Sequence, residues 1–260
     1  MLEVIDKGSV TKSHPVPLLF VHGACGTAGI WDDHFLGFFA DKGYRAVALS
    51  FRGHGASSLS RPLHSCSIAD YVEDVHAVVA KLESAPVLIG HSMGCWVVLK
   101  YCQMHGAPAA VLMAPGTPQG LRRWAVRAAL RHPLVVLRSS TFGNPADFFS
   151  TAALTREFIF SAHTPEAIVR SCAARLQPES RRAARETVNR LPDVSLVKAP
   201  MLVLGADADG MRVAGDASAV ARLYQADAEI FPDMGHVMML EPGWPAVAEK
   251  IDGWVTMRGL

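Results

Sequence analysis

The chain has 260 residues, of which 50% are hydrophobic and 19% are charged. This length favours one large domain or one domain with an insertion, and the composition excludes a disordered, collagen-like or coiled-coil protein. Lys and Arg number 25 against 24 Asp and Glu, so the net charge of +1 gives no overall attraction to nucleic acid or to an anionic membrane, and no nucleic-acid partner is expected.

The cysteines and the first seven residues indicate the cellular compartment in which the protein is expected. Five cysteines without a Cys-x-x-Cys spacing cannot form a fully paired disulfide framework. Residues 1–7 carry acids where a secretory signal would place basic residues before an apolar stretch. Every apolar run is much shorter than the roughly 18 residues that a transmembrane helix needs. We therefore expect a cytoplasmic protein without membrane insertion.

Short apolar runs alternate along the chain with segments of helical periodicity. Six of these runs are expected to be buried strands: 16–21, 45–50, 86–89, 109–114, 201–205 and 228–231. This alternation is typical of a mostly parallel sheet covered by helices on both faces, which is an α/β fold.

Three helices of the expected fold have clear signals. Ser67 and Asp70 resemble a capping box, and apolar residues follow at helical spacing from 72 to 82. Two further helices are expected at 93–105 and 244–257.

The fourth and fifth expected strands are separated by more than eighty residues of helical character. Unstructured loops of that length are rare in compact domains. We therefore expect 117–195 to form a helical cap inserted into a core domain made of 1–116 and 196–260. Within the cap, Thr164-Pro165-Glu166 predicts an N-cap followed by a proline at the first helical position.

The segment Gly90-His91-Ser92-Met93-Gly94 lies directly between an expected strand and an expected helix. This is the context of a nucleophile elbow, in which the serine adopts a strained backbone on a tight turn and the crowded positions on either side are glycine. Ser92 is therefore the candidate nucleophile. A serine hydroxyl needs an adjacent base, and that base needs an orienting acid.

The candidate base and acid follow later in the chain. His236 lies after the last expected strand, where the chain order Ser, acid, His predicts the base. Asp207 and Asp209 both follow the strand at 201–205, at the sheet edge where open parallel sheets bind ligands. Either of them can be the orienting acid.

Acyl transfer also needs N–H donors directed at the developing oxyanion. The N–H of Met93, directly after the nucleophile, is one candidate, and that of Ala24, in the loop after the first expected strand, is the other. Cys25 has no dedicated base of its own, so it is interpreted as a small apolar loop thiol.

These segments together resemble the α/β-hydrolase superfamily over nearly the whole chain. The matching segments are 19–23 (Leu-Phe-Val-His-Gly), 52–55 (Arg-Gly-His-Gly), 90–94 (Gly-His-Ser-Met-Gly), 205–209 and 234–236 (Met-Gly-His). The chain is most similar to small bacterial carboxylesterases and lipase-like enzymes with a helical cap. The resemblance implies a catalytic triad and an oxyanion hole formed by Ser92, Asp209, His236, Ala24 and Met93. It favours Asp209, with Asp207 as the alternative acid.

The expected function is hydrolysis of a small carboxylic ester through an acyl-enzyme. Lactones, thioesters and carbon-carbon bonds are alternative substrates, because the same machinery cleaves them and the cap forms the pocket. A non-catalytic receptor with this fold is a further alternative. No cofactor or metal is expected, since the sequence has no His-Glu-x-x-His, Cys/His cluster or phosphate-binding loop.

The cap is rich in arginine. Residues 117–193 contain twelve Arg and no Lys against six acids, which leaves +6 on this segment. The simpler interpretation is that these arginines pair with acids of the core domain. The alternative is that some of them line the entrance and attract an anionic substrate. The apolar residues expected to form an acyl-binding wall, or only core, are Leu121, Trp124, Phe148, Phe149, Phe158 and Phe160.

Overall fold

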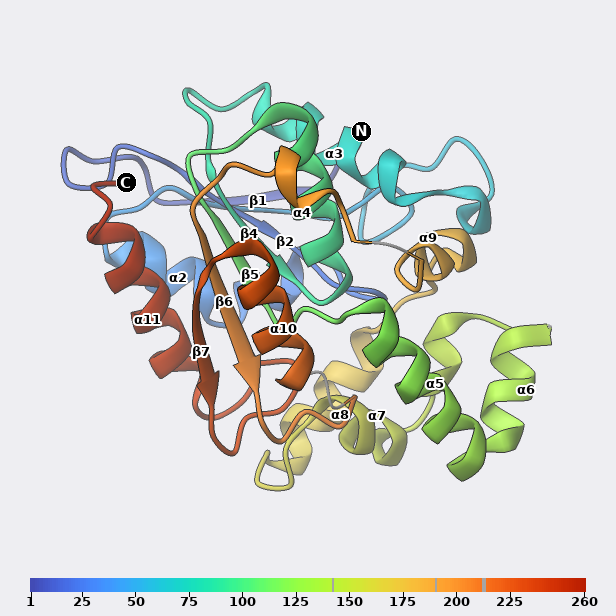
Figure 1. The fold of residues 1–260 in the computed structure, drawn as a ribbon. Helices are drawn as coiled ribbons and strands as arrows, with labels where there is room; N and C mark the ends of the chain where they lie inside the picture. The colour runs from blue at the N-terminus through green and yellow to red at the C-terminus, as the bar shows by residue number, and fades with distance from the viewer. Residues whose placement is uncertain (142, 190, 212–213) are drawn as a thin grey trace.

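A seven-stranded sheet forms the centre of the protein (Figure 1). The structure, a computed structural model, describes all residues except 142, 190, 212 and 213. The strands are β1 (Val4–Lys7), β2 (Leu18–Val21), β3 (Ala46–Leu49), β4 (Val87–His91), β5 (Ala110–Met113), β6 (Met201–Ala206) and β7 (Asp227–Phe231). Their order is β1-β3-β2-β4-β5-β6-β7, and only β1 is antiparallel to its neighbour. The expected α/β fold with a mostly parallel sheet is confirmed.

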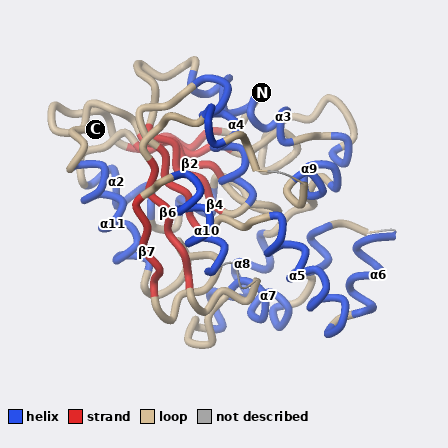
Figure 2. Tube along the Cα trace, viewed as in Figure 1, coloured by secondary structure: helices blue, strands red, loops and turns tan. Residues whose placement is uncertain are grey.

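The sheet is covered on both faces, which Figure 2 shows as a single layer of strands between helices. The covering helices are α1 (Gly29–Asp32), α2 (Phe35–Asp41) and α11 (Trp244–Thr256) on one face and α3 (Ile68–Val79), α4 (Met93–His105) and α10 (Ala214–Tyr224) on the other. In β2, Leu18 and Phe20 pack on the first face, and Leu19 and Val21 pack on the second. Burial on both faces explains why the strands are continuous apolar runs in the sequence.

The expected elements of the sheet and its helices are confirmed with small shifts of their ends. Each of the six apolar runs overlaps a strand, and α4 and α11 lie where helices were expected. Ser67 and Asp70 form the expected capping box at the start of α3. β1 is a single strand that pairs with β3 at the edge of the sheet.

The chain between β5 and β6 is helical. Its elements are α5 (Pro118–Arg131), α6 (Pro133–Thr141), η2 (Pro145–Phe149), α7 (Ala152–Ile159), α8 (Glu166–Arg175), α9 (Arg181–Glu186) and η3 (Val194–Leu196). The structure places no strand in the described residues of 117–195. Figure 1 shows α7 and α8 toward the carboxyl ends of β6 and β7, and α5 and α6 farther to the right.

The expected start of α8 is wrong by one residue. Pro165 is the N-cap residue, and no side chain caps the helix. The Thr164 hydroxyl instead donates a hydrogen bond of 2.6 Å to Glu241, which also accepts hydrogen bonds from the N–H and hydroxyl of Ser161. Glu241 is only 1% exposed, so its carboxylate needs these donors more than the helix needs a cap.

The turn between β4 and α4 has a strained backbone. Ser92 has a φ of 51°, in the left-handed region that side chains rarely adopt. A Cβ on Gly90 would lie 2.7 Å from the carbonyl oxygen of Gly94, as the crowding argument expects. A Cβ on Gly94 would overlap the carbonyl oxygen of Val21, so this glycine is crowded by β2. The serine turn therefore depends on the close approach of two strands and one helix.

The variant Gly94→Ala tests this packing. The added methyl group would press on the backbone of β2, so we expect a loss of about 3 kcal/mol in the free energy of unfolding, measured by urea denaturation. Gly253→Ala in α11 is the matched control, because a Cβ there meets no atom within 4 Å. It should stabilise the protein by about 0.5 to 1 kcal/mol through helix propensity. Equal stability of the two variants would contradict the packing argument.

Candidate active site

Three polar side chains meet at the carboxyl edge of the sheet. Ser92 lies on the turn after β4, Asp209 in the loop after β6, and His236 in the loop after β7. His236 Nε2 lies 2.8 Å from Ser92 Oγ, and His236 Nδ1 lies 2.7 Å from Asp209 Oδ2. The carboxylate accepts the Nδ1 proton, which leaves Nε2 free to accept the serine proton. Residues far apart in sequence thus form one continuous hydrogen-bonded chain.

Of the two candidate acids, only Asp209 reaches His236. Asp209 is 2% exposed, and its second oxygen accepts the N–H of Met211 at 2.7 Å. The side chain of Asp207 is exposed, and its backbone N–H bonds to the carbonyl of Phe231. The turn after β6 therefore directs the two acids to different environments.

His91, the residue before the serine, supports the histidine loop. Its Nε2 lies 2.9 Å from the carbonyl oxygen of His236. Burial lowers the pKa of His91 to about 3, so the ring is neutral and donates its single N–H to this carbonyl. The sequence interpretation treated His91 only as a position within the Gly-x-Ser-x-Gly pattern and missed this contact.

The candidate oxyanion donors lie beside the serine. A Cβ on Gly23 would be 3.0 Å from Ser92 Cβ, so the loop after β2 packs directly against the elbow. Ala24 and Met93 both line the same cavity as Ser92. Within the described residues, neither backbone N–H donates a hydrogen bond. Both N–H groups are available to a ligand.

Cys25 is held on both sides by the chain between α8 and α9. Its N–H donates to Glu179 Oε2 at 3.1 Å, and its carbonyl accepts the N–H of Gln177 at 2.9 Å. Its φ of 63° is in the left-handed region, so these bonds fix a strained residue directly after Ala24. Burial raises the pKa of the Cys25 thiol well above its ordinary value, which agrees with a loop thiol rather than a nucleophile.

Glu179 is the centre of a buried cluster that sequence reasoning missed. Its side chain has no exposed surface, and it accepts hydrogen bonds from Tyr71 at 2.7 Å and from the N–H of Ser180 at 2.6 Å. His54 Nε2 lies 3.3 Å from it. Burial opposes both charges, yet the contact between the two groups lowers the pKa of Glu179 and raises that of His54. The two shifts therefore favour opposite charges on this buried pair, a carboxylate on Glu179 and a proton on His54.

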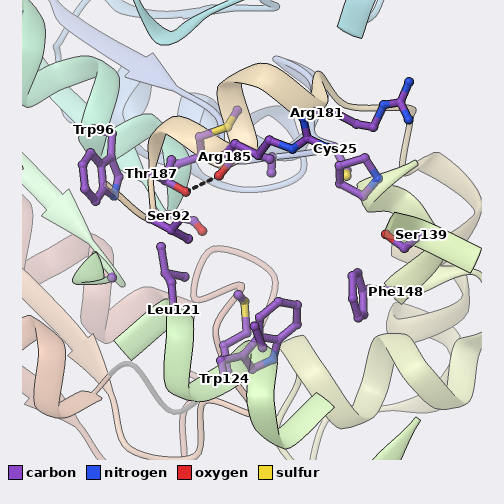
Figure 3. Close-up of a pocket in the computed structure, with 18 of the residues that line it drawn as sticks. Cys25, Ser92, Trp96, Leu121, Trp124, Ser139, Phe148, Arg181, Arg185 and Thr187 are labelled. Carbon is purple, nitrogen blue, oxygen red and sulfur yellow. Dashed lines mark hydrogen bonds between the residues drawn. The ribbon is translucent and has the colours of Figure 1, made fainter. Parts of the chain in front are cut away.

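A cavity of about 370 Å³ opens at Ser92 (Figure 3). Its other walls are largely apolar and come from the inserted helices: they include Leu121, Trp124, Phe148 and Phe149. Phe158 and Phe160 are instead buried in the core and do not line it. Arg181 and Arg185 of α9 also line the cavity, on the side opposite Trp124 in Figure 3.

Two further observations concern ligands and membranes. Within the described part of the chain, no group of three His, Cys, Asp or Glu side chains is arranged to hold a metal ion. Among the helices of the same residues, none combines the length and apolar character that a membrane span requires.

Comparison with known proteins places the chain in a family. The family model described as "Alpha/beta hydrolase family" matches residues 18–249. A non-heme chloroperoxidase from Burkholderia pyrrocinia is 28% identical over 244 residues, which are 86% of each chain. A thermophilic esterase from Thermogutta terrifontis has a similar structure, with a TM-score of 0.77 at 20% identity over 100% of this chain and 94% of its own. An enzyme described as degrading N-acyl homoserine lactones gives a TM-score of 0.74 at 20% identity, over 97% and 96% of the two chains. The chain belongs to the alpha/beta hydrolase family.

Proposed function

We propose that this protein is a serine hydrolase that cleaves carboxylic esters through an acyl-enzyme. The observation that carries the proposal is the hydrogen-bonded chain from Asp209 through His236 to Ser92, which ends at a largely apolar cavity. This is the arrangement that activates a serine hydroxyl for attack on a carbonyl carbon.

In the proposed mechanism, Ser92 Oγ attacks the ester carbonyl carbon while His236 Nε2 takes the hydroxyl proton. Asp209 stabilises the imidazolium, and the N–H groups of Ala24 and Met93 stabilise the oxyanion. The tetrahedral intermediate then expels the alcohol, which receives the proton from His236. A water molecule activated by His236 attacks the acyl-enzyme, and this step releases the carboxylic acid and restores Ser92.

Residues 117–195 act in this proposal as a cap on a core domain of 1–116 and 196–260. Leu121, Trp124, Phe148 and Phe149 offer an apolar wall for the acyl or alcohol part of the substrate. A cytoplasmic location is supported by the five cysteines, all of which are free and buried.

Related carbonyl substrates remain alternatives because the triad sets the chemistry and the cavity sets the substrate. Lactones and thioesters present the same electrophile, and one structural neighbour is described as a lactone-degrading enzyme. A screen across ester chain lengths, thioesters and lactones distinguishes these classes by kcat/KM.

The proposed nucleophile is tested with a fluorophosphonate probe. The folded protein should form one covalent adduct on Ser92, and Ser92→Ala should form none. Ser92→Ala and His236→Ala should each lower kcat by about 10⁴- to 10⁶-fold, because triad members act as a unit. Circular dichroism checks that both variants stay folded. Absence of labelling in the folded wild type would favour the receptor alternative, and retained activity in either variant would contradict the triad.

The acid is tested by two matched substitutions. Asp209→Asn should lower kcat by about 10³- to 10⁴-fold, because the amide favours the wrong histidine tautomer. Asp207→Asn should leave kcat near the wild-type value, since that side chain is exposed. Equal and modest losses in the two variants would show that the acid lies elsewhere.

Glu179 is proposed to position the oxyanion loop. It binds the N–H of Cys25, while Gln177 binds the carbonyl of the same residue. Because Cys25 follows Ala24 directly, these two bonds restrict the direction of the Ala24 N–H. A donor that moves by a fraction of an ångström stabilises the oxyanion less well.

Glu179→Gln tests this role, because it keeps the shape of the side chain and removes its charge. We expect kcat to fall about 10- to 100-fold with little change in KM, since the loss falls on the transition state. Asp74→Asn is the control: Asp74 is a buried carboxylate of α3 that binds Arg52. It should lower the stability without lowering kcat. Equal losses of kcat in the two variants would show that Glu179 has only a structural role.

A further inference from the structure

Arg181 and Arg185 differ from the other arginines of the segment 117–195. They lie four residues apart on α9 and line the cavity that contains Ser92. Each of the other arginines that the structure describes in this segment contacts a carboxylate or a backbone carbonyl, as Arg123 contacts Asp216 and Arg175 contacts Asp33. For the guanidinium groups of Arg181 and Arg185, the structure gives no such partner among the described residues. The expected pairing with acids of the core domain is found for Arg123 and Arg175. The other ion pairs of this segment join residues within 117–195, and Arg181 and Arg185 have no carboxylate partner among the described residues.

The orientation of α9 is fixed from its opposite side. The Ser180 hydroxyl before the helix donates to the carbonyl of Cys66, and Glu186 at its end accepts the N–H of Ile68. Arg182, between the two cavity arginines, donates to the carbonyl of Ser65. These bonds hold the helix against the start of α3, so that Arg181 and Arg185 lie on the cavity side.

The charge of the cavity is unbalanced. Among the described residues that line it, the only charged side chains are Arg181 and Arg185, and none is acidic. Two like charges at this helical spacing repel each other by a few tenths of a kcal/mol. Apolar walls nearby strengthen the field of both cations at the cavity. An anion bound between them would remove the repulsion and satisfy the guanidinium donors.

We propose that the substrate is an ester that carries an anionic group, a carboxylate, which Arg181 and Arg185 bind while the ester carbonyl reaches Ser92. The planar guanidinium offers paired N–H donors that match the two oxygens of a carboxylate. The apolar middle of the substrate lies against Leu121 and Trp124. This inference rests on the proposed esterase function and adds the substrate class.

The test compares two series of p-nitrophenyl esters. One series consists of mono-p-nitrophenyl esters of dicarboxylic acids, and the other of p-nitrophenyl esters of fatty acids with the same number of carbon atoms. At low salt the wild type should show a higher kcat/KM for the carboxylate-bearing member at one or more lengths. This preference should decline as the salt concentration rises, because exposed charges are screened.

Arg181→Gln and Arg185→Gln should each lower the ratio of kcat/KM between the charged and the neutral ester about tenfold, which corresponds to about 1.4 kcal/mol. Arg170→Gln is the matched control, because Arg170 lies on α8, is 73% exposed and pairs with Glu166. It should leave the ratio unchanged. Equal kcat/KM for the two series at every length in the wild type, or a ratio unaffected by both cavity substitutions, would overturn the proposal.

A binding measurement separates this inference from the proposed function. The Ser92→Ala protein should bind the uncleaved charged ester more tightly than the neutral one in calorimetry, and Arg181→Gln in that background should abolish the difference. If the wild type cleaves no ester, the esterase proposal is wrong, and the binding difference still tests the anion site. Equal affinities for the two esters would overturn the anion site alone.

Discussion

The left-handed backbone of Ser92 is the constraint on which the site depends. Such a conformation costs about 1 to 3 kcal/mol, so the surrounding structure must impose it. The close contacts of Gly90 and Gly94 with α4 and β2 provide that constraint, and every residue of β2 is buried. The core on both faces of the sheet therefore does more than stabilise the fold. It holds a hydroxyl group at the end of β4 in a direction that an unstrained turn would not give.

Buried carboxylates fix the loops around this serine. Asp209 binds the ring of His236, Glu179 binds the loop after β2, and Glu241 binds the chain between α7 and α8. Each is almost completely buried, and each accepts at least two hydrogen bonds, which compensates the loss of hydration. Two of the three bonds join the segment 117–195 to the rest of the protein. Loops that neither strand nor helix would fix are thus held by charge-assisted hydrogen bonds.

A feature could be predicted from the sequence when the residues that determine it are close together in the chain. The strands, the capping box of α3 and the turn at Ser92 have local patterns, and the structure has them where they were expected. The spacing could not choose between Asp207 and Asp209, because the choice depends on which side chain the turn after β6 buries. The α8 cap was mispredicted since a distant carboxylate, Glu241, binds Thr164. Glu179 had no local signal at all, because its partners Cys25 and Tyr71 lie more than a hundred residues away.

The two hydrogen bonds that join Cys25 to Gln177 and Glu179 affect how a substrate can reach the cavity. A cap joined to its core only at two hinges can swing open as a rigid lid. Here such a swing would break the bonds of Cys25 to Gln177 and Glu179 and would separate the carboxylate of Glu179 from its donors Cys25 and Tyr71. Under the proposed function, we therefore expect the segment around α9 to stay in place during the catalytic cycle. We then expect the substrate to enter past the wall formed by α5 and α6. If the segment 117–195 is a cap as proposed, its exchange with that of a relative would have to keep Glu179 together with its partners.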